Sequence, residues 1–280
     1  MTAHMNRRFG KRLAGVLLAV SVVAVALGAD AKAASENGSR RGRLHVAAAS
    51  DLVYCLEALQ VAYAGLAPDV DVTVSTGSSG NFFAQIRHGA PYDVFLSADI
   101  RYPRALVDAG LAKGETLRTY AIGRLVLWST RPEIEVAQGL TSLGSERVRR
   151  VAIAQPEHAP YGRAARQVFE RSGLWTAVQR KLVLGENIAQ TAQFIQTGHA
   201  DVGLVALSLV RAPRLRGIGR YWLVPDDLHE PLEQAVVLTR RGAANPAAVE
   251  FIAFLSKPTA REIFERFGFS LPTESPADAN

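Results

Sequence analysis

Short apolar segments with the period of a strand alternate with amphipathic segments with the period of a helix, and this alternation constrains the fold more than any other feature. In the first half of the chain the expected strands lie at 44–50, 70–75 and 92–98, and the expected helices at 51–66, 80–89 and 101–110. Strands that alternate with helices predict an α/β domain with a largely parallel sheet.

A second series of the same kind follows a long apolar strand expected at 121–130. Its strands are expected at 150–155, 201–207, 220–225 and 232–240, and its helices at 162–173 and 187–198, before two C-terminal helices that begin at Pro246 and Pro258. Proline is favoured at the first position of a helix. Two α/β units joined by long strands near 121–130 and 232–240 predict two lobes with two crossovers between them.

The first residues have the pattern of a secretory signal peptide. Basic residues precede an apolar run from Leu13 to Leu27, and small residues at A-x-A spacing predict cleavage after Ala31 or Ala33. The run is shorter than the roughly 20 residues of a transmembrane helix. We therefore expect a signal peptide at 1–33, a linker at 34–42, a first lobe of 43–122 plus 237–271, a second lobe of 123–236, and a disordered tail at 272–280.

The charge of the chain argues against nucleic acid and membrane surfaces as partners. The net charge is +6, but residues 1–33 hold 5 of the 32 basic and 1 of the 26 acidic residues, which leaves 27 against 25, or +2. Without a block of like charge, binding to either partner has little electrostatic support. Cys55 is the single cysteine, so no intramolecular disulfide can form, and we expect it to be a small buried apolar residue.

Four places in the sequence share one design, in which a strand ends, a small or hydroxyl-bearing residue follows, and a helix begins. The junctions lie at Ser50, at Ser78 and Ser79 in TGSSGNF, at Tyr161 in PEHAPYG, and at Ile188 in LGENIAQ. The first N–H groups of a helix have no intrahelical partner, and each helix start carries roughly +0.5 charge. Four convergent starts would give a field of order +2, which predicts a tetrahedral oxyanion bound by hydroxyls and amides at the carboxyl ends of the strands.

Each junction also has a simpler explanation. Ser50 or Ser79 alone could be an ordinary helix N-cap. Glu157 and His158 could suggest a metal, but neighbouring residues cannot share a helical face, and we predict no direct protein ligand to a metal. A serine and a histidine could suggest a hydrolase, but the chain lacks a G-x-S-x-G elbow and an evident orienting acid, so we predict no enzyme activity. The repetition of one design at four junctions favours the anion site.

One series of motifs extends over residues 44–270. In order, it comprises AAASDL, TGSSGNFFAQIRHGAPYDVFLSAD, AQPEHAPYGRAA, GENIAQ, ADVGLVALS and FERFGF. This order resembles the periplasmic molybdate-binding proteins of ABC importers, for which GAPYDVFLSAD and PEHAPYG are specific. The resemblance implies a two-lobe type II periplasmic-binding-protein fold with an oxyanion between the lobes. It also implies a monomer in the periplasm that captures molybdate or tungstate, uses no cofactor, and delivers the ion to a membrane permease.

The resemblance also implies which residues bind the oxyanion. The two ligand serines of the family correspond to Ser50 and Ser79, and its two backbone amide donors to Tyr161 and Ile188. The neighbouring residues Ser78 and Asp51 are further candidates.

Two positions leave the ligand geometry open. Some family members place a ligand-bonding tyrosine where this sequence has Ala206, so the ring of Tyr161 could fill that space or its hydroxyl could reach the anion. We expect Asp51 to be a solvent-facing acid favoured by the helix dipole. Turned inward, it could accept a proton from hydrogen phosphate and repel a fully ionised anion. Molybdate and tungstate carry no proton at neutral pH and need donors only.

The size of the ion is a second basis for selectivity. A cage set for longer metal–oxygen bonds would leave its donors unpaired around the smaller sulfate. Two alternatives remain open, a receptor for another oxyanion or small organic anion, and a secreted hydrolase.

Overall fold

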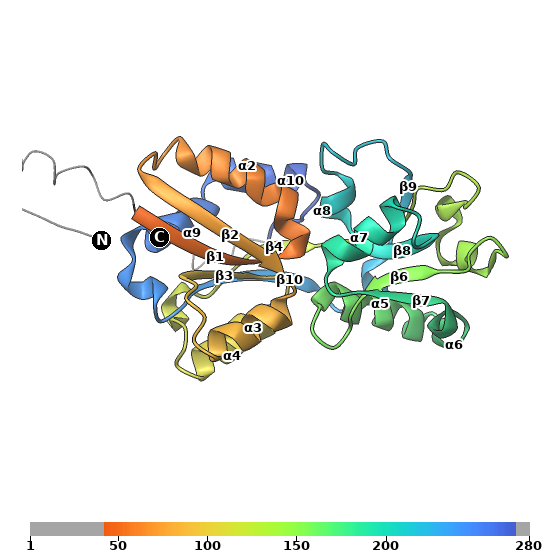
Figure 1. The fold of residues 1–280 in the computed structure, drawn as a ribbon, viewed down its shortest axis with the longest axis horizontal. Coiled ribbons are helices and arrows are strands. Elements are labelled where there is room, and N and C mark those ends of the chain that lie inside the picture. The colour runs from red at the N-terminus through yellow and green to blue at the C-terminus, as the bar shows by residue number, and fades with distance from the viewer. Residues whose placement is uncertain (1–41, 273–280) are drawn as a thin grey trace, which may run out of the picture. The chain divides into compact units, whose positions relative to one another are not determined.

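Two five-stranded sheets organise residues 42–272, the part of the chain that the computed structural model describes (Figure 1). The first sheet has the order β2-β1-β3-β10-β4, with β1 Gly42–Ala49, β2 Val70–Gly77, β3 Val94–Ser97, β10 Leu232–Leu238 and β4 Arg118–Gly123. The second has the order β7-β6-β8-β5-β9, with β7 Leu182–Gly185, β6 Val151–Ala154, β8 Val202–Ala206, β5 Leu125–Ser129 and β9 Arg220–Leu223. The predicted α/β fold with two lobes is confirmed.

In each sheet four strands run in one direction and one strand is reversed. The reversed strand is β10 in the first sheet, antiparallel to β3 and β4, and β5 in the second, antiparallel to β8 and β9. Both reversed strands begin after the chain has crossed from the other lobe. A crossing chain arrives at the edge where the parallel strands end, so the strand that it adds must run away from that edge.

The first crossover corrects the prediction of one strand over 121–130. Strand β4 ends at Gly123 in the first sheet and β5 begins at Leu125 in the second, with Arg124 between them. A continuous apolar run does not reveal such a change of sheet. On the return, β10 pairs with the first sheet from Leu232 onward. We therefore propose that the second lobe boundary lies before Leu232 rather than between 236 and 237.

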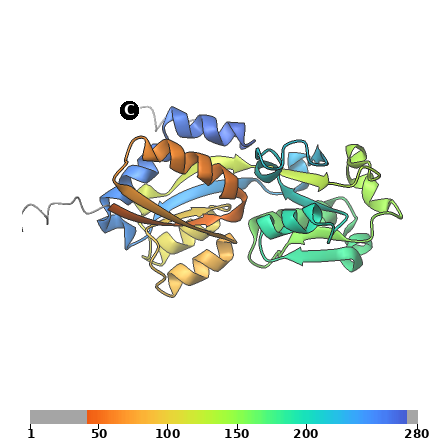
Figure 2. The ribbon, with the colours of Figure 1, turned by 45° about the horizontal axis from the view of Figure 1, so that its top comes forward.

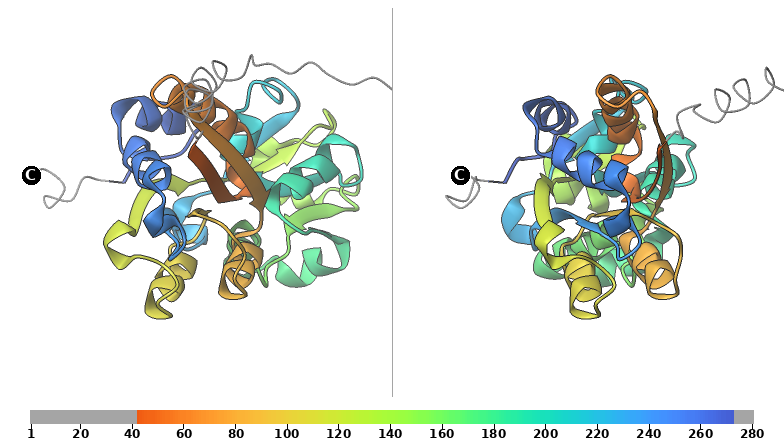
Figure 3. Two further views of the ribbon diagram at one scale, coloured as in Figure 1. Left: turned by 60° about the vertical axis from the view of Figure 1, so that its left-hand side comes forward. Right: turned by 90° about the vertical axis from the view of Figure 1, so that its left-hand side faces the viewer.

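Alternate residues of the first sheet face two different layers of helices. Val46, Leu96 and Val236 belong to a core shared with α2 Val53–Ala64, α9 Pro246–Leu255 and α10 Pro258–Arg266. The neighbouring residues Ala47 and Phe95 pack instead with α3 Ser79–Arg87 and α4 Arg101–Asp108. The period of two therefore buries both faces of the sheet. Figures 1 and 3 show α3 and α4 on the opposite side from α2, and Figure 2 shows α2 beside α10.

The second sheet is covered in the same way by the helices of the second lobe. These are α5 Pro160–Arg171, α6 Trp175–Val178, α7 Ile188–Gln196 and α8 Leu207–Val210. The sequence patterns gave no range for β7, α6 and α8, although they predicted β3, β6 and β9, which are equally short. Cys55 is fully buried, as predicted. Within residues 42–272 no helix is both long enough and apolar enough to cross a membrane.

The predictions for the two ends of the chain fall almost entirely outside the described residues. The signal peptide expected at 1–33 and the linker at 34–42 lie there, except that Gly42 begins β1. Of the tail expected at 272–280, the structure describes residue 272 only.

Candidate oxyanion site

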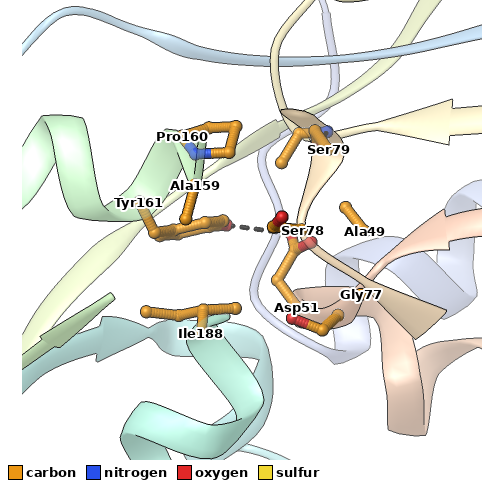
Figure 4. A pocket seen from close by; sticks show the side chains of 11 residues that line it. Ala49, Asp51, Gly77, Ser78, Ser79, Ala159, Pro160, Tyr161 and Ile188 are labelled. Carbon is orange, nitrogen blue, oxygen red and sulfur yellow. Dashed lines mark hydrogen bonds between the residues drawn. The ribbon is translucent and has the colours of Figure 1, made fainter. Parts of the chain in front are cut away.

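A small cavity lies where the carboxyl ends of the strands of the two sheets meet. The space between its lining atoms, open solvent included, is about 190 Å³, of which the centre of a water molecule can reach only about 10 Å³. That is close to the least that holds one water molecule, so the cavity suits a ligand of very few atoms. All six predicted site residues are among the eleven that line it (Figure 4), namely Ala49, Ser50, Asp51, Gly77, Ser78, Ser79, Ala98, Ala159, Pro160, Tyr161 and Ile188.

The four strand–helix junctions named from the sequence converge on this cavity. Strand β1 ends directly before a 3-10 turn that begins at Ser50, and β2 ends two residues before α3 begins at Ser79. In the second lobe, loops follow β6 and β7 and lead into α5 and α7, which contribute Tyr161 and Ile188. Each lobe therefore contributes two helix starts, and each start has positive character.

Two serine hydroxyls each accept one backbone hydrogen bond, which leaves the hydroxyl hydrogen free to donate. The Oγ atom of Ser79 accepts from the N–H of Ala98 at 3.0 Å. The Oγ atom of Ser50 accepts from the N–H of Ala189, in the other lobe, at 3.4 Å. Both serines are buried. A hydroxyl has one donor hydrogen and two lone pairs, so the two serines can each donate to an anion in the cavity.

Ser78 has a different environment from Ser79. Its Oγ atom caps α3 by accepting from the N–H of Asn81 at 3.3 Å, and it lies 2.9 Å from Nδ1 of His158. Its hydroxyl is therefore already engaged with two protein groups. The structure thus forms a serine–histidine pair, but no carboxylate among the described residues accepts a hydrogen bond from His158, so these residues do not form a catalytic triad.

The starts of α5 and α7 supply backbone donors. Helix α5 has Pro160 at its first turn and no side-chain cap, so the N–H of Tyr161 has no partner within the helix. In α7, the side chain of Asn187 caps the N–H of Gln190, and the N–H of Ala189 donates to a serine. The N–H of Ile188 is then the remaining donor of that first turn.

Asp51 does not face solvent, which corrects the expectation from the sequence. Its relative exposure is 1%. Its Oδ2 atom accepts hydrogen bonds from the hydroxyl of Tyr161 at 3.1 Å, marked in Figure 4, and from Nε2 of Gln234 at 2.9 Å. The hydroxyl of Tyr161 is therefore committed to Asp51, an arrangement that the sequence analysis did not consider. Ala206 is buried and is not among the residues that line the cavity.

Burial raises the pKa of Asp51 to about 7, although the hydrogen bonds from Tyr161 and Gln234 act in the opposite direction. Burial, together with the nearby carboxyl of Asp51, also raises the pKa of Tyr161 and of Tyr120 well above the usual value. Sequence reasoning missed Gln234 and Tyr120. The available signal was a glutamine in the middle of the apolar strand LEQAVVL, where a polar side chain needs a buried partner.

The two lobes contact each other around the cavity. The N–H of Gly80 donates to the carbonyl oxygen of His158 at 2.9 Å, and the carboxylate of Asp99 forms an ion pair with Arg163. A Cβ atom added to Gly80 would lie 2.7 Å from that carbonyl oxygen, so only glycine allows this approach. The site is therefore completed by groups from both lobes held together.

The donors around the cavity suit an anion and not a cation. No lysine, arginine or histidine is among the eleven lining residues. Over residues 42–272 no group of three or more histidine, cysteine, aspartate or glutamate side chains is placed to hold a metal ion. Two hydroxyls and two backbone amides at helix starts are the groups that bind oxyanions without a formal counter-charge.

Comparison with known proteins points to one family. Residues 44–270 match the family of bacterial extracellular solute-binding proteins. The Molybdate-binding protein ModA of Azotobacter vinelandii is 43% identical over 201 residues, which cover 71% of this chain and 79% of that protein. The ModA of Rhodobacter capsulatus is 41% identical over 198 residues, 71% and 77% of the two chains. The structure of the Azotobacter vinelandii periplasmic molybdate-binding protein superposes with a TM-score of 0.78 at 36% identity, covering 82% of this chain and all of the other.

Proposed function

The chain belongs to the bacterial extracellular solute-binding protein family, and from this premise we propose that it captures molybdate between its two lobes for an ABC importer. Members of this family bind solutes and carry out no reaction on them. The carrying observation is the convergence of two free serine hydroxyls and two helix-start amides on one small cavity.

We propose that Ser50, Ser79, Tyr161 and Ile188 bind the four oxygens of the anion. All four residues line the cavity, and we expect the two serines to donate from their hydroxyls and the other two residues from their backbone N–H groups. Four donors and four helix starts suit a tetrahedral dianion. Ser78 has a supporting role as the cap of α3, since its hydroxyl is engaged by Asn81 and His158.

The same donor set extends the proposal to tungstate, which has the same shape and charge. The receptor is exported to the periplasm and delivers the anion to the membrane permease of the importer. We propose that it acts as a monomer, as the resemblance to the periplasmic molybdate-binding proteins implies. Closure of the lobes around the anion is the step that the permease can recognise.

A thermal-shift experiment tests this function. A ligand at a thousand times its Kd stabilises a folded protein by about 4 kcal/mol, which corresponds to a rise in Tm of roughly 8–16 °C for a chain of this size. We expect such a rise with molybdate and with tungstate, and much less with sulfate or phosphate at the same concentration. Ser50→Ala is the matched control and should reduce the molybdate shift.

The outcome distinguishes the proposal from its rivals. Equal shifts with sulfate and molybdate would indicate a general oxyanion receptor. A shift with small organic anions and none with molybdate would indicate a different ligand class. Turnover of an ester or phosphoester by the parent, lost in Ser78→Ala, would indicate a hydrolase and overturn the proposal.

A further inference from the structure

The two oxygens of the Asp51 carboxyl have different environments. Oδ2 accepts hydrogen bonds from Tyr161 and Gln234. Oδ1 is buried and has no hydrogen-bond partner among the described residues. Asp51 is also the single carboxyl among the eleven residues that line the cavity. A buried polar atom without a partner, in the wall of a ligand cavity, indicates a contact that the ligand itself supplies.

The surrounding hydrogen bonds determine where a proton on this carboxyl would lie. The hydroxyl of Tyr120 donates to Oε1 of Gln234 at 3.1 Å, so the amide nitrogen of Gln234 faces Asp51. Both neighbours of Oδ2, the Gln234 amide and the Tyr161 hydroxyl, are therefore donors. A proton on Oδ2 would face these donors, whereas a proton on Oδ1 would face none. The neutral acid consequently carries its hydrogen on Oδ1.

No charged group among the described residues compensates a negative charge on Asp51. The titratable groups around it are Tyr161 on α5, Tyr120 on β4 and Cys55 on α2, and burial raises the pKa of each well above its usual value, so all three stay neutral near pH 7. The hydroxyl of Ser208, on α8, donates to the backbone oxygen of Asp51 and is uncharged. No ion pair involves Asp51 within residues 42–272.

We propose that Asp51 binds the oxyanion as a neutral carboxylic acid, donating a hydrogen bond from Oδ1, so that capture of the anion in alkaline solution takes up one proton. The inference rests on the proposed function and adds a fifth donor to its site. The proton comes from the solvent or buffer, stays on Oδ1 while the anion is bound, and returns to solvent on release. A carboxylate at this position would instead repel a dianion.

The consequence is a defined dependence of affinity on pH. Burial, opposed by the hydrogen bonds to the carboxyl, holds the pKa of Asp51 in the ligand-free site at about 7, and a nearby dianion raises it further because like charges repel. Below pH 6 the acid is already neutral, and affinity is constant. Above pH 7 each unit of pH leaves about a tenfold smaller fraction of neutral acid, so affinity for molybdate falls about a hundredfold between pH 6 and pH 9.

Titration calorimetry with sodium molybdate at pH 6, 7, 8 and 9 tests this inference on three proteins. The parent should lose about a hundredfold in affinity over that range and, in buffers of different ionisation enthalpy, should take up about one proton at pH 9. Asp51→Asn presents an N–H in place of the acid hydrogen, so it should still bind molybdate at pH 6, and its affinity should stay constant from there to pH 9. Asp71→Asn, at an exposed position on β2, should keep the pH dependence of the parent.

The contrary outcomes separate this inference from the function on which it rests. Tight binding by the parent that does not change with pH would overturn the inference and leave the function standing. A pH dependence that persists in Asp51→Asn would assign the proton to another group. Tighter molybdate binding by Asp51→Asn at pH 6, with hydrogen phosphate bound by the parent alone, would show that the carboxyl is ionised in the complex. Failure of the parent to bind molybdate at any pH would overturn the function itself.

Discussion

Replacing Asp51 by asparagine should stabilise the ligand-free protein, and the gain should depend on pH. The carboxyl is buried, and its pKa rises from 3.8 in the unfolded chain to about 7 in the folded one. Between these values the folded state binds more protons than the unfolded state, so stability of the parent falls as pH rises. The full loss is (7 − 3.8) × 1.36, or about 4 kcal/mol above pH 7. Asparagine does not ionise, so the free energy of unfolding of Asp51→Asn does not fall in this way as pH rises.

Urea unfolding of both proteins at pH 5, 6, 7, 8 and 9, without anion, measures the effect. The quantity of interest is the free energy of unfolding of Asp51→Asn minus that of the parent. It should rise by about 3 kcal/mol between pH 5 and pH 7, at 1.36 kcal/mol per unit, and stay level above. The carbonyl oxygen of asparagine can still accept from Tyr161 and Gln234, so the substitution keeps the surrounding hydrogen bonds.

A difference that is constant from pH 5 to pH 9 would refute this reasoning, because it would mean that Asp51 has the same pKa in both states. A difference that falls with pH would reverse the sign and show that the folded protein prefers the carboxylate. Asp71→Asn makes the same chemical change at an exposed position and should give no such rise. Equal slopes of free energy against urea in all three proteins would exclude a change in the denatured state as the cause.

Three further substitutions test the site. Ser79→Ala removes one hydrogen bond to a charged ligand and should weaken molybdate binding at pH 6 by about 1.5–3 kcal/mol, or roughly ten- to a hundredfold; unchanged affinity by calorimetry would place the anion elsewhere. Tyr161→Phe removes a donor to Asp51 and not to the anion, so affinity at pH 6 should change by no more than a few-fold. Loss of this donor raises the pKa of Asp51, so in the Tyr161→Phe background the free energy of unfolding gained by Asp51→Asn should level off at a higher pH. A loss of affinity as large as that of Ser79→Ala would show that the hydroxyl contacts the anion. Gly80→Ala should raise the stability of helix α3 by up to about 1 kcal/mol. It should nevertheless weaken molybdate binding at least about tenfold, because the added Cβ would lie 2.7 Å from the carbonyl oxygen of His158 in the other lobe. Unchanged affinity would mean that the lobes do not need this contact.

Much of the fold followed from the sequence because its elements have strong periods. Strands such as β1 and β2 and helices such as α2 and α7 were predicted within a few residues. The four-residue strands β3, β6 and β9 were predicted as well, whereas no range was given for β7 of the same length. The apolar run at 121–130 was taken as one strand because hydrophobicity does not record a change of sheet at Arg124.

The positions of the candidate site residues were also predictable, for a topological reason. Parallel strands of one sheet end at the same edge, so residues at strand–helix junctions come together even when they are far apart in sequence. Ser50, Ser79, Tyr161 and Ile188 were named on that ground and on resemblance, and all four line one cavity. Their role as ligands remains a prediction that the substitutions above can test.

The sequence by itself thus determined the succession of elements, the two lobes and the edge at which the candidate site lies, because these depend on local period and on the direction of strands. Tertiary structure alone decided what each polar group in the cavity can do. Ser78 and Ser79 are neighbours, yet the hydroxyl of Ser78 lies between the N–H of Asn81 and a ring nitrogen of His158, whereas that of Ser79 accepts one bond from Ala98 and keeps its hydrogen free. The state of Asp51 depends on Gln234, 183 residues away, and on the exclusion of water from around the carboxyl. Desolvation and hydrogen-bond direction are properties of the packed chain, so no pattern in the sequence contains them.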